Sequence, residues 1–488
     1  MGAGQDSVLK EPPVIRKDPV TILREDIKSL LDNPDLSNAV AGIYVRSCKT
    51  GETIFKYNES KNLIPASLTK LFTTATALDY LKSDFKYSTK LYLDGDISKD
   101  GEFTGNIIIR AVGDPTLSEK FGTDINLVLD SWARSISAMG IKKINGNIIC
   151  DDTYFDAQFY PPGWSVDDLI EAYAAPVSAV SVFDNSIKIK ITAGDSVGMK
   201  ASNSIEPENN FIRVHCDVLT VSQDKPEEIS VARNKEFEII EISGQIPFDS
   251  NKTSSTTVEL PVLNPTEFLL KLFKEHLANN DIVFTGALFD YASAGFELNY
   301  LDLTSLTNYQ SPPLASIIRN INTYSNNLAA EMLLKTVGKE GTGKGSFDSG
   351  IEMVKKFCSG LGIPSEKLIL YDGSGLSRYN LVQPKYVVDL LFKIYFSKQR
   401  DVFINSLARP GREGTLKRRI TNSSAEKRVF AKTGSMNNVS NLAGYVITAD
   451  GEYLAFAIMI SNFTAPATLA QNIQDLICMR LATFSRKE

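Results

Sequence analysis

A strand-like stretch in the middle of the chain, with helical patterns on both sides, constrains the fold most strongly. Between residues 186 and 259, apolar and polar residues alternate, as in Ile187-Lys188-Ile189-Lys190-Ile191, and no convincing helical pattern interrupts them. Helical spacing occurs before and after this stretch. The chain of 488 residues is also too long for one hydrophobic core. These features predict a multidomain α/β (α+β) protein with a β-rich insertion.

The changes of pattern along the chain predict its division into domains. Residues 20–86 and 300–488 are expected to form one discontinuous domain, in which helices lie on both sides of a sheet. Residues 87–185 and 260–299 are expected to form an inserted α+β domain, and residues 186–259 a β-rich domain nested within it. Residues 1–19 mix charge and proline without periodicity and are expected to be a flexible lead-in.

Hydrophobic periodicity predicts the individual elements. In the discontinuous domain, helices are expected at residues 20–31, 67–80, 314–335, 346–361, 384–395 and 466–484. Strands are expected there at residues 41–48, 53–57, 430–433, 442–448 and 453–460. In the inserted domains, helices are expected at residues 125–139 and 265–277, and strands at 90–93, 106–111, 144–150, 187–191, 211–214 and 237–242.

Composition argues against several classes of function. The net charge of −6 gives no basic footprint for nucleic acid. No stretch reaches the roughly eighteen apolar residues of a membrane span, and the first residues do not resemble a signal peptide. Either the protein is cytoplasmic or its export signal is absent from this chain. Five cysteines without a C-x-x-C pair and only two histidines, His215 and His276, lead us to expect no metal and no cofactor.

A serine and a lysine at helical spacing form the first candidate for chemistry. Ser67-Leu68-Thr69-Lys70 follows Pro65-Ala66 and opens an amphipathic helix. Residues three apart share a helix face, so the Lys70 amine can reach the Ser67 hydroxyl and act as its base where histidine is scarce. Three other S-x-x-K sequences, beginning at Ser83, Ser222 and Ser424, lack this context. An N-cap serine with a solvated lysine is the plain alternative.

Two further motifs follow in order along the chain. Ser325-Asn326-Asn327 lies inside the helix expected at residues 314–335 and supplies a hydroxyl and an amide. Lys432-Thr433-Gly434-Ser435 ends an expected apolar strand, and its glycine lets a substrate backbone approach closely. Lys49-Thr50-Gly51 has the same three letters, but it lies in an expected hairpin turn.

The ordered set of S-x-x-K on a helix, S-x-N and a strand-borne K-T-G resembles the penicillin-recognising serine enzymes. Ser325 comes 255 positions after Lys70, which is similar to the class C low-molecular-mass penicillin-binding proteins, the D-alanyl-D-alanine carboxypeptidase/endopeptidase family S13. That family has a β-lactamase-like transpeptidase domain with two nested insertions. Further family-like stretches are Gly113–Leu117, Asp151–Phe155, Asp372–Arg378 and Pro410–Leu416.

The resemblance implies a mechanism and a set of site residues. Ser67 would attack the carbonyl between two D-alanines with Lys70 as base, and Ser325 with Lys432 would pass the proton to the leaving amine. Asn327 would hold the substrate backbone. Thr433 and Ser435, on either side of Gly434, would bind the terminal carboxylate. The implied oxyanion hole consists of the backbone N–H groups of Ser67 and Ser435.

The resemblance also implies partners and a location. The substrates would be peptidoglycan stem peptides ending in D-Ala-D-Ala, and β-lactam antibiotics would acylate the same serine. Because peptidoglycan lies outside the cytoplasmic membrane, an extracytoplasmic location is expected, in the periplasm or cell envelope. The balance between carboxypeptidase and endopeptidase action and the oligomeric state stay open.

Several alternatives compete with this interpretation. A β-lactamase or esterase on the same fold would carry the same motifs, and a cell-wall scaffold could retain them without activity. Glu331 follows Asn327 on the same helix, where some β-lactamases carry a water-activating glutamate, but we expect a structural role for it. The stretch from Gly338 to Lys344 fits G-x-x-x-x-G-K, yet Gly345 replaces the expected Ser or Thr, so a flexible linker is predicted rather than a phosphate-binding loop.

Overall fold

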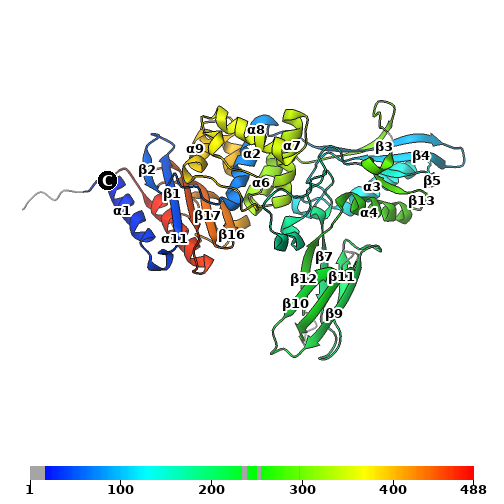
Figure 1. Cartoon of the computed structure of the whole chain (residues 1–488), viewed down its shortest axis with the longest axis horizontal. Coiled ribbons are helices and arrows are strands. Elements are labelled where there is room, and N and C mark those ends of the chain that lie inside the picture. The colour runs from blue at the N-terminus through cyan, green and yellow to red at the C-terminus, as the bar shows by residue number, and fades with distance from the viewer. Residues whose placement is uncertain (1–16, 234–238, 250–253, 296, 488) are drawn as a thin grey trace, which may run out of the picture.

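The computed structural model describes residues 17–233, 239–249, 254–295 and 297–487. The first sixteen residues of the expected lead-in, and part of the strand expected at 237–242, lie outside these ranges. Figure 1 shows an elongated molecule, with both chain ends in the domain at one end and a mixed α/β unit at the other. A β-rich module projects sideways between them.

A five-stranded antiparallel sheet forms the centre of the discontinuous domain. Its strands run in the order β16-β17-β18-β1-β2, so the first and last segments of the domain share one sheet. The strands are β1 (Val40–Ser47), β2 (Thr53–Tyr57), β16 (Val429–Met436), β17 (Val439–Ile447) and β18 (Tyr453–Ser461). β16 is an edge strand. Ala431 on its outer side forms a single bridge with Ala408, and among the described residues no named strand pairs with that side.

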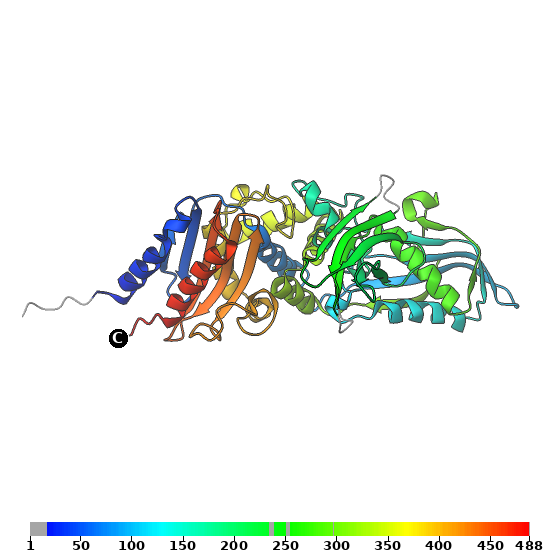
Figure 2. The ribbon, with the colours of Figure 1, turned by 90° about the horizontal axis from the view of Figure 1, so that it is seen from below.

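Helices cover both faces of this sheet. The helices α1 (Pro19–Leu31) and α11 (Ala467–Thr483) pack together over one face, as Figure 2 shows in blue and red. The other face carries the larger core and the remaining helices. These are α2 (Thr69–Tyr80), α6 (Leu314–Tyr324), α7 (Asn327–Thr342), α8 (Phe347–Gly360), α9 (Pro384–Tyr395) and α10 (Arg400–Ser406). The domain therefore has three layers, as expected.

A seven-stranded mixed sheet forms the inserted α/β unit. Its strands are β3 (Ser88–Ile97), β4 (Glu102–Arg110), β5 (Lys143–Asn145), β6 (Ile148–Asp151), β13 (Val283–Phe284), β14 (Leu288–Asp290) and β15 (Thr304–Gln310). Helices α3 (Ile125–Ala138) and α4 (Pro265–Asn279) pack on it, and α5 (Tyr291–Ala294) follows β14. Because β15 pairs with β3, this sheet extends past the boundary expected at residue 299. We propose Gln310 as the end of the unit.

The nested module contains two three-stranded sheets, in the orders β10-β11-β9 and β12-β7-β8. The strands are β7 (Ser186–Thr192), β8 (Ser202–Glu206), β9 (Arg213–Val221), β10 (Glu228–Arg233), β11 (Ile239–Pro247) and β12 (Ser255–Pro261). Alternating side chains such as Ile187, Ile189 and Ile191 are buried between the sheets. The alternation in the sequence therefore corresponds to strands with one buried face and one more exposed face.

Two expectations about helices were wrong. The helix expected at 314–335 is two helices, because Ser325 adopts a left-handed conformation with φ of 64° between α6 and α7. The linker expected from Gly338 to Lys344 is mostly the last turn of α7, which ends at Thr342. Gly338 is buried against the start of α8, and Ser346 caps that helix. Among the described residues, no helix has the length and apolarity to cross a membrane.

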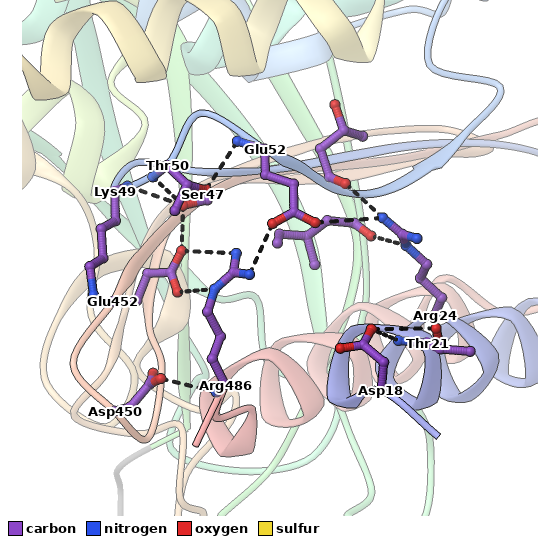
Figure 3. Close-up of polar contacts among 12 residues, drawn as sticks. Asp18, Thr21, Arg24, Ser47, Lys49, Thr50, Glu52, Asp450, Glu452 and Arg486 are labelled. Atoms are coloured by element: carbon purple, nitrogen blue, oxygen red, sulfur yellow. Dashed lines mark hydrogen bonds and ion pairs between the residues drawn. The ribbon is translucent and has the colours of Figure 1, made fainter. Parts of the chain in front are cut away.

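A polar cluster ties the chain ends to the sheet (Figure 3). Arg486, after the last helix, contacts Glu52 at 2.9 Å and Glu452 at 2.8 Å. The Ser47 hydroxyl donates to Glu452 and accepts the backbone N–H groups of Lys49 (3.1 Å) and Thr50 (2.9 Å). Lys49-Thr50-Gly51 is thus a hydrogen-bonded turn between β1 and β2, as expected.

Candidate active site

Ser67 and Lys70 lie at the junction of a short 3₁₀ turn, Ala66–Leu68, and helix α2. The Lys70 ammonium nitrogen is 3.0 Å from the Ser67 hydroxyl oxygen, as the i, i+3 spacing predicts. Ser67 is partly exposed, whereas Lys70 is completely buried. Ala66 has a left-handed φ of 46°, a costly conformation that is often found where a fold fixes a functional side chain.

Lys70 is held by three partners in a buried environment. Its Nζ donates to the Asn327 side-chain oxygen at 2.6 Å and to the Ser374 backbone oxygen at 2.7 Å, besides Ser67. Burial lowers the pKa of Lys70 to about 7, although the nearby carboxylates Glu331 and Asp372 oppose this shift. A substantial fraction of the amine is therefore neutral at physiological pH and can accept a proton.

The S-x-N motif forms the turn between α6 and α7 rather than a helical turn. Asn326 caps α7 by accepting the Ala329 N–H at 3.1 Å, and Asn327 is the first residue of that helix. Hydrophobic spacing continues across the break, so periodicity alone could not detect it. Three consecutive polar residues, with asparagine at an N-cap position, were the available signal.

Lys432 links the K-T-G strand to this turn. Its Nζ donates to the Ser325 hydroxyl at 2.8 Å and to the Thr433 backbone oxygen at 2.9 Å. The motif lies within β16, which continues to Met436, and not at the strand end that we expected. Burial first, and the positive charge of Lys70 second, lower the pKa of Lys432 well below its usual range.

Gly434 brings the strand against the nucleophile turn. A Cβ atom at this position would lie 2.8 Å from the Pro65 backbone oxygen and 3.3 Å from the Ser67 nitrogen. Only glycine fits this approach without displacing the 3₁₀ turn. Of its neighbours, Thr433 is almost fully buried and Ser435 is exposed. Contacts thus bring the S-x-x-K serine and lysine, Asn327 and Gly434 together, and join Lys432 to Ser325. Thr433 and Ser435 flank Gly434 on β16.

Sequence reasoning missed a buried support for Lys70. Both carboxylate oxygens of Glu331 accept backbone N–H groups, from Gly373 at 2.8 Å and Ser374 at 2.7 Å. Ser374 in turn presents its carbonyl to Lys70. Burial and Asp372 raise the pKa of Glu331 to about 8, while these N–H groups oppose the rise. The structural role of Glu331 is therefore to hold the loop whose Ser374 carbonyl contacts Lys70.

The loop that follows is organised around the Asp372 carboxylate. It accepts the N–H groups of Gly375 (2.9 Å) and Ser377 (2.6 Å), the Asn380 amide (2.6 Å) and the Trp164 indole (3.0 Å). Trp164 comes from the inserted segment, so this loop connects that segment to Lys70. The family-like stretch Asp372–Arg378 was noticed in the sequence, but its role was not.

The two histidines lie elsewhere. His276 of α4 contacts Asp130 of α3 at 2.7 Å, and His215 lies on β9 of the nested module. Among the described residues, no group of three or more His, Cys, Asp or Glu side chains is arranged to hold a metal ion. The contacts around Ser67 involve a lysine where other serine enzymes use histidine.

Comparison with known proteins identifies the family. The sequence profile of the D-Ala-D-Ala carboxypeptidase 3 (S13) family matches residues 23–483. The chain belongs to this family. The D-alanyl-D-alanine carboxypeptidase of Actinomadura sp. (strain R39) is 33% identical over 476 residues, which are 96% of this chain and 85% of that protein. The predicted enzyme class, a serine-type D-Ala-D-Ala carboxypeptidase, is confirmed.

Solved structures share the fold. Penicillin binding protein 4 (dacB) from Haemophilus influenzae superposes with a TM-score of 0.79 and 25% identity, covering 92% of this chain and 98% of that one. The same protein complexed with a β-lactam gives a TM-score of 0.76 at 24% identity, covering 94% and 100%. The predicted fold class, a β-lactamase-like domain with insertions, is confirmed.

Proposed function

We propose that Ser67 is the nucleophile of this D-Ala-D-Ala carboxypeptidase and that Lys70 is its base. The 3.0 Å hydrogen bond between the Ser67 hydroxyl and the buried Lys70 amine carries this proposal. Burial lowers the pKa of Lys70 to about 7, so a neutral amine is available at little free-energy cost. Partial exposure of Ser67 leaves its hydroxyl open to a substrate.

Acylation then moves the Ser67 proton in steps to the leaving amine. Lys70 takes the Ser67 proton as the oxygen attacks the carbonyl carbon between the two D-alanines. The N–H groups of Ser67 and Ser435 stabilise the resulting oxyanion. Ser325 and Lys432 relay the proton that Lys70 accepted to the leaving D-alanine nitrogen, the C–N bond breaks, and the acyl group stays on Ser67 as an ester. Water then hydrolyses the ester and regenerates the enzyme.

Substrate binding uses the open edge of β16. An extended peptide can add to this edge strand through its backbone, beside Gly434. Thr433 and Ser435 offer two hydroxyl groups for the terminal carboxylate, beside the Lys432 amine. The Asn327 amide, already next to Lys70, would hold the peptide on the other side. We infer that peptidoglycan stem peptides are the substrates, and that the protein acts outside the cytoplasmic membrane.

β-Lactams are expected to acylate the same serine and to leave slowly. Some β-lactamases activate the deacylating water with a glutamate placed after S-x-N. Here both oxygens of Glu331 accept backbone N–H groups, and the side chain is completely buried. Glu331 is therefore bound to this loop and shielded from solvent, which favours a peptidase over a β-lactamase.

Intact-mass spectrometry after mixing with benzylpenicillin, followed by peptide mapping, tests the nucleophile. A stable one-to-one adduct on Ser67, absent from Ser67→Ala, is the expected result. Unmodified protein with consumed penicillin would point instead to a β-lactamase. Neither adduct nor turnover would favour the inactive scaffold.

A further inference from the structure

A further completely buried lysine lies one helical turn from Glu331. Lys335 follows Glu331 by four positions on α7, so the two side chains share one face of the helix. Both residues are completely buried. Lys335 has no part in the acylation sequence proposed above, although burying a charge is costly unless the charge has partners. Its partners therefore indicate what this lysine does.

Most partners of Lys335 come from the inserted segment that follows β6. The Lys335 Nζ lies 2.7 Å from the Asp156 carboxylate and donates to the Gln158 backbone oxygen at 2.8 Å. The ring centres of Phe155 and of Phe347, on α8, lie 5.4 Å and 4.4 Å from the same nitrogen, which is the geometry of cation–π contacts. These contacts stabilise the protonated amine. Lys335 is therefore held as a cation inside the protein.

Opposite charges connect Lys335 to the proposed base through Glu331. Burial lowers the pKa of Lys335, and the ionised forms of Asp156 and Glu331 oppose this shift. Because the attraction is mutual, the Lys335 cation favours the ionised form of Glu331. Glu331, when ionised, in turn raises the pKa of Lys70. A chain of electrostatic interactions thus runs from the inserted segment to Lys70.

Asp372 and Lys432 also belong to this group of buried charges. Asp372 lies in the loop that supports Lys70. Burial and Asp372 raise the pKa of Glu331, and Asp372 opposes the burial that lowers the pKa of Lys70. Lys432 lies on β16, where burial and then the charge of Lys70 lower its own pKa. Replacing Lys335 leaves both of these residues in place, so its effect on Lys70 should pass through Glu331.

We propose that Lys335 is a positioning residue that favours the ionised form of Glu331 and thereby sets the pH range in which Lys70 acts as a base. The inference rests on the proposed function, because it takes Lys70 as the base of Ser67. The carboxylate that stabilises Lys335, that of Asp156, comes from the inserted segment. This segment therefore takes part in adjusting the base, although the base lies in another domain.

Lys335→Met tests the proposal, because methionine is of similar length and removes the charge. Without this cation Glu331 is ionised less, so the Lys70 amine loses its proton more readily. In the pH profile of benzylpenicillin acylation, the rising limb should move to lower pH by about half a unit, which makes the rate on the limb roughly threefold faster relative to the plateau. Lys339→Met is the matched control, because it removes a cation from the same helix two turns from Glu331, and its limb should stay in place.

A double variant separates this electrostatic route from a general disturbance of packing. In Glu331→Gln the carboxylate is already absent, so the addition of Lys335→Met should not move the limb further. A disturbance of packing would move the limb equally in both backgrounds. If Lys335→Met does not fold, Lys335→Gln takes its place, because its amide can still donate to the Gln158 backbone oxygen.

The remaining outcomes are also decisive. A limb that stays in place without the Lys335 cation, that moves to higher pH, or that moves equally with and without the Glu331 carboxylate would overturn the inference. A flat profile in the wild type, or normal acylation in Lys70→Ala, would instead contradict the proposed function.

Discussion

The chain contains two Lys-Thr-Gly sequences, each beside a serine, and they behave in opposite ways. At the β1–β2 turn, Ser47 is fully buried. Its hydroxyl donates to Glu452 and accepts two backbone N–H groups (Figure 3). At the proposed reaction centre, the partly exposed Ser67 hydroxyl accepts from the buried Lys70 amine. The letters are the same, but only the second place combines an accessible hydroxyl with a desolvated base.

Charge compensation explains the difference. Glu452 is paired with Arg486, and this pairing raises the pKa of Arg486 above its usual value, which keeps the guanidinium charged. Among the described residues, no carboxylate contacts Lys70 directly, and its partners are a hydroxyl, an amide oxygen and a carbonyl. A buried cation without a contacting anion loses its proton easily. The carboxylate beside Ser47 is therefore paired with a cation, whereas the amine beside Ser67 is not paired with an anion.

The two serines give the largest expected contrast. Ser67→Ala should reduce kcat/KM for a D-Ala-D-Ala peptide on the order of 10⁴-fold or more, because no acyl-enzyme can form. Ser47→Ala should leave the acylation rate of the folded protein unchanged. It should lower the free energy of unfolding by about 1–3 kcal/mol, because Glu452 and two N–H groups lose a partner. Denaturant unfolding and penicillin labelling measure the two effects separately, and an exchange of phenotypes would refute the comparison.

The two lysines should differ almost as strongly. Lys70→Ala should slow acylation by benzylpenicillin about 10²–10⁴-fold, the usual contribution of a general base. Lys49 is exposed in the turn, so Lys49→Ala should acylate at the wild-type rate. Stopped-flow or quenched-flow labelling gives the rates. Normal acylation in Lys70→Ala would remove this lysine from the mechanism.

The pH dependence of acylation sharpens the assignment of Lys70. Because the neutral amine is the active form and burial lowers its pKa to about 7, the rate should rise with pH through this value and level off above it. Below pH 7 the rate should fall about tenfold per pH unit as the amine becomes protonated. The second-order rate constant for benzylpenicillin between pH 5 and 9 measures this profile. A flat profile over that range would contradict the role of a titrating base.

Much of this site was predictable because its residues are close in sequence or carry a recognisable order. The i, i+3 spacing of Ser67 and Lys70 predicts their contact, and strand alternation predicts β16 to β18. The proximity of Lys432 to Ser325 was expected only through the family resemblance, and the contact of Lys70 with Asn327 was not expected. No periodicity brings together residues so far apart in the chain.

What the sequence could not predict depends on backbone conformation and burial. The left-handed Ser325 splits an apparently continuous helix without disturbing its apolar pattern. The carboxylates of Glu331 and Asp372 are buried because backbone N–H groups of one loop satisfy them, and those contacts appear only once the loop has folded. A buried charge of this kind has no signature in composition or spacing.

The smallest expected effect separates the two buried glutamates. When ionised, Glu331 raises the pKa of Lys70. Because burial raises the pKa of Glu331 itself to about 8, Glu331→Gln removes only part of a negative charge near pH 7. The rising limb of the acylation profile should therefore move to lower pH. The plateau rate should fall only a few-fold, because the glutamine amide can accept one of the two loop N–H groups and not both. Glu452→Gln, at the other serine, should leave the limb in place although it also alters a buried carboxylate. A limb that stays fixed in Glu331→Gln, or moves to higher pH, would show that this carboxylate does not act on Lys70.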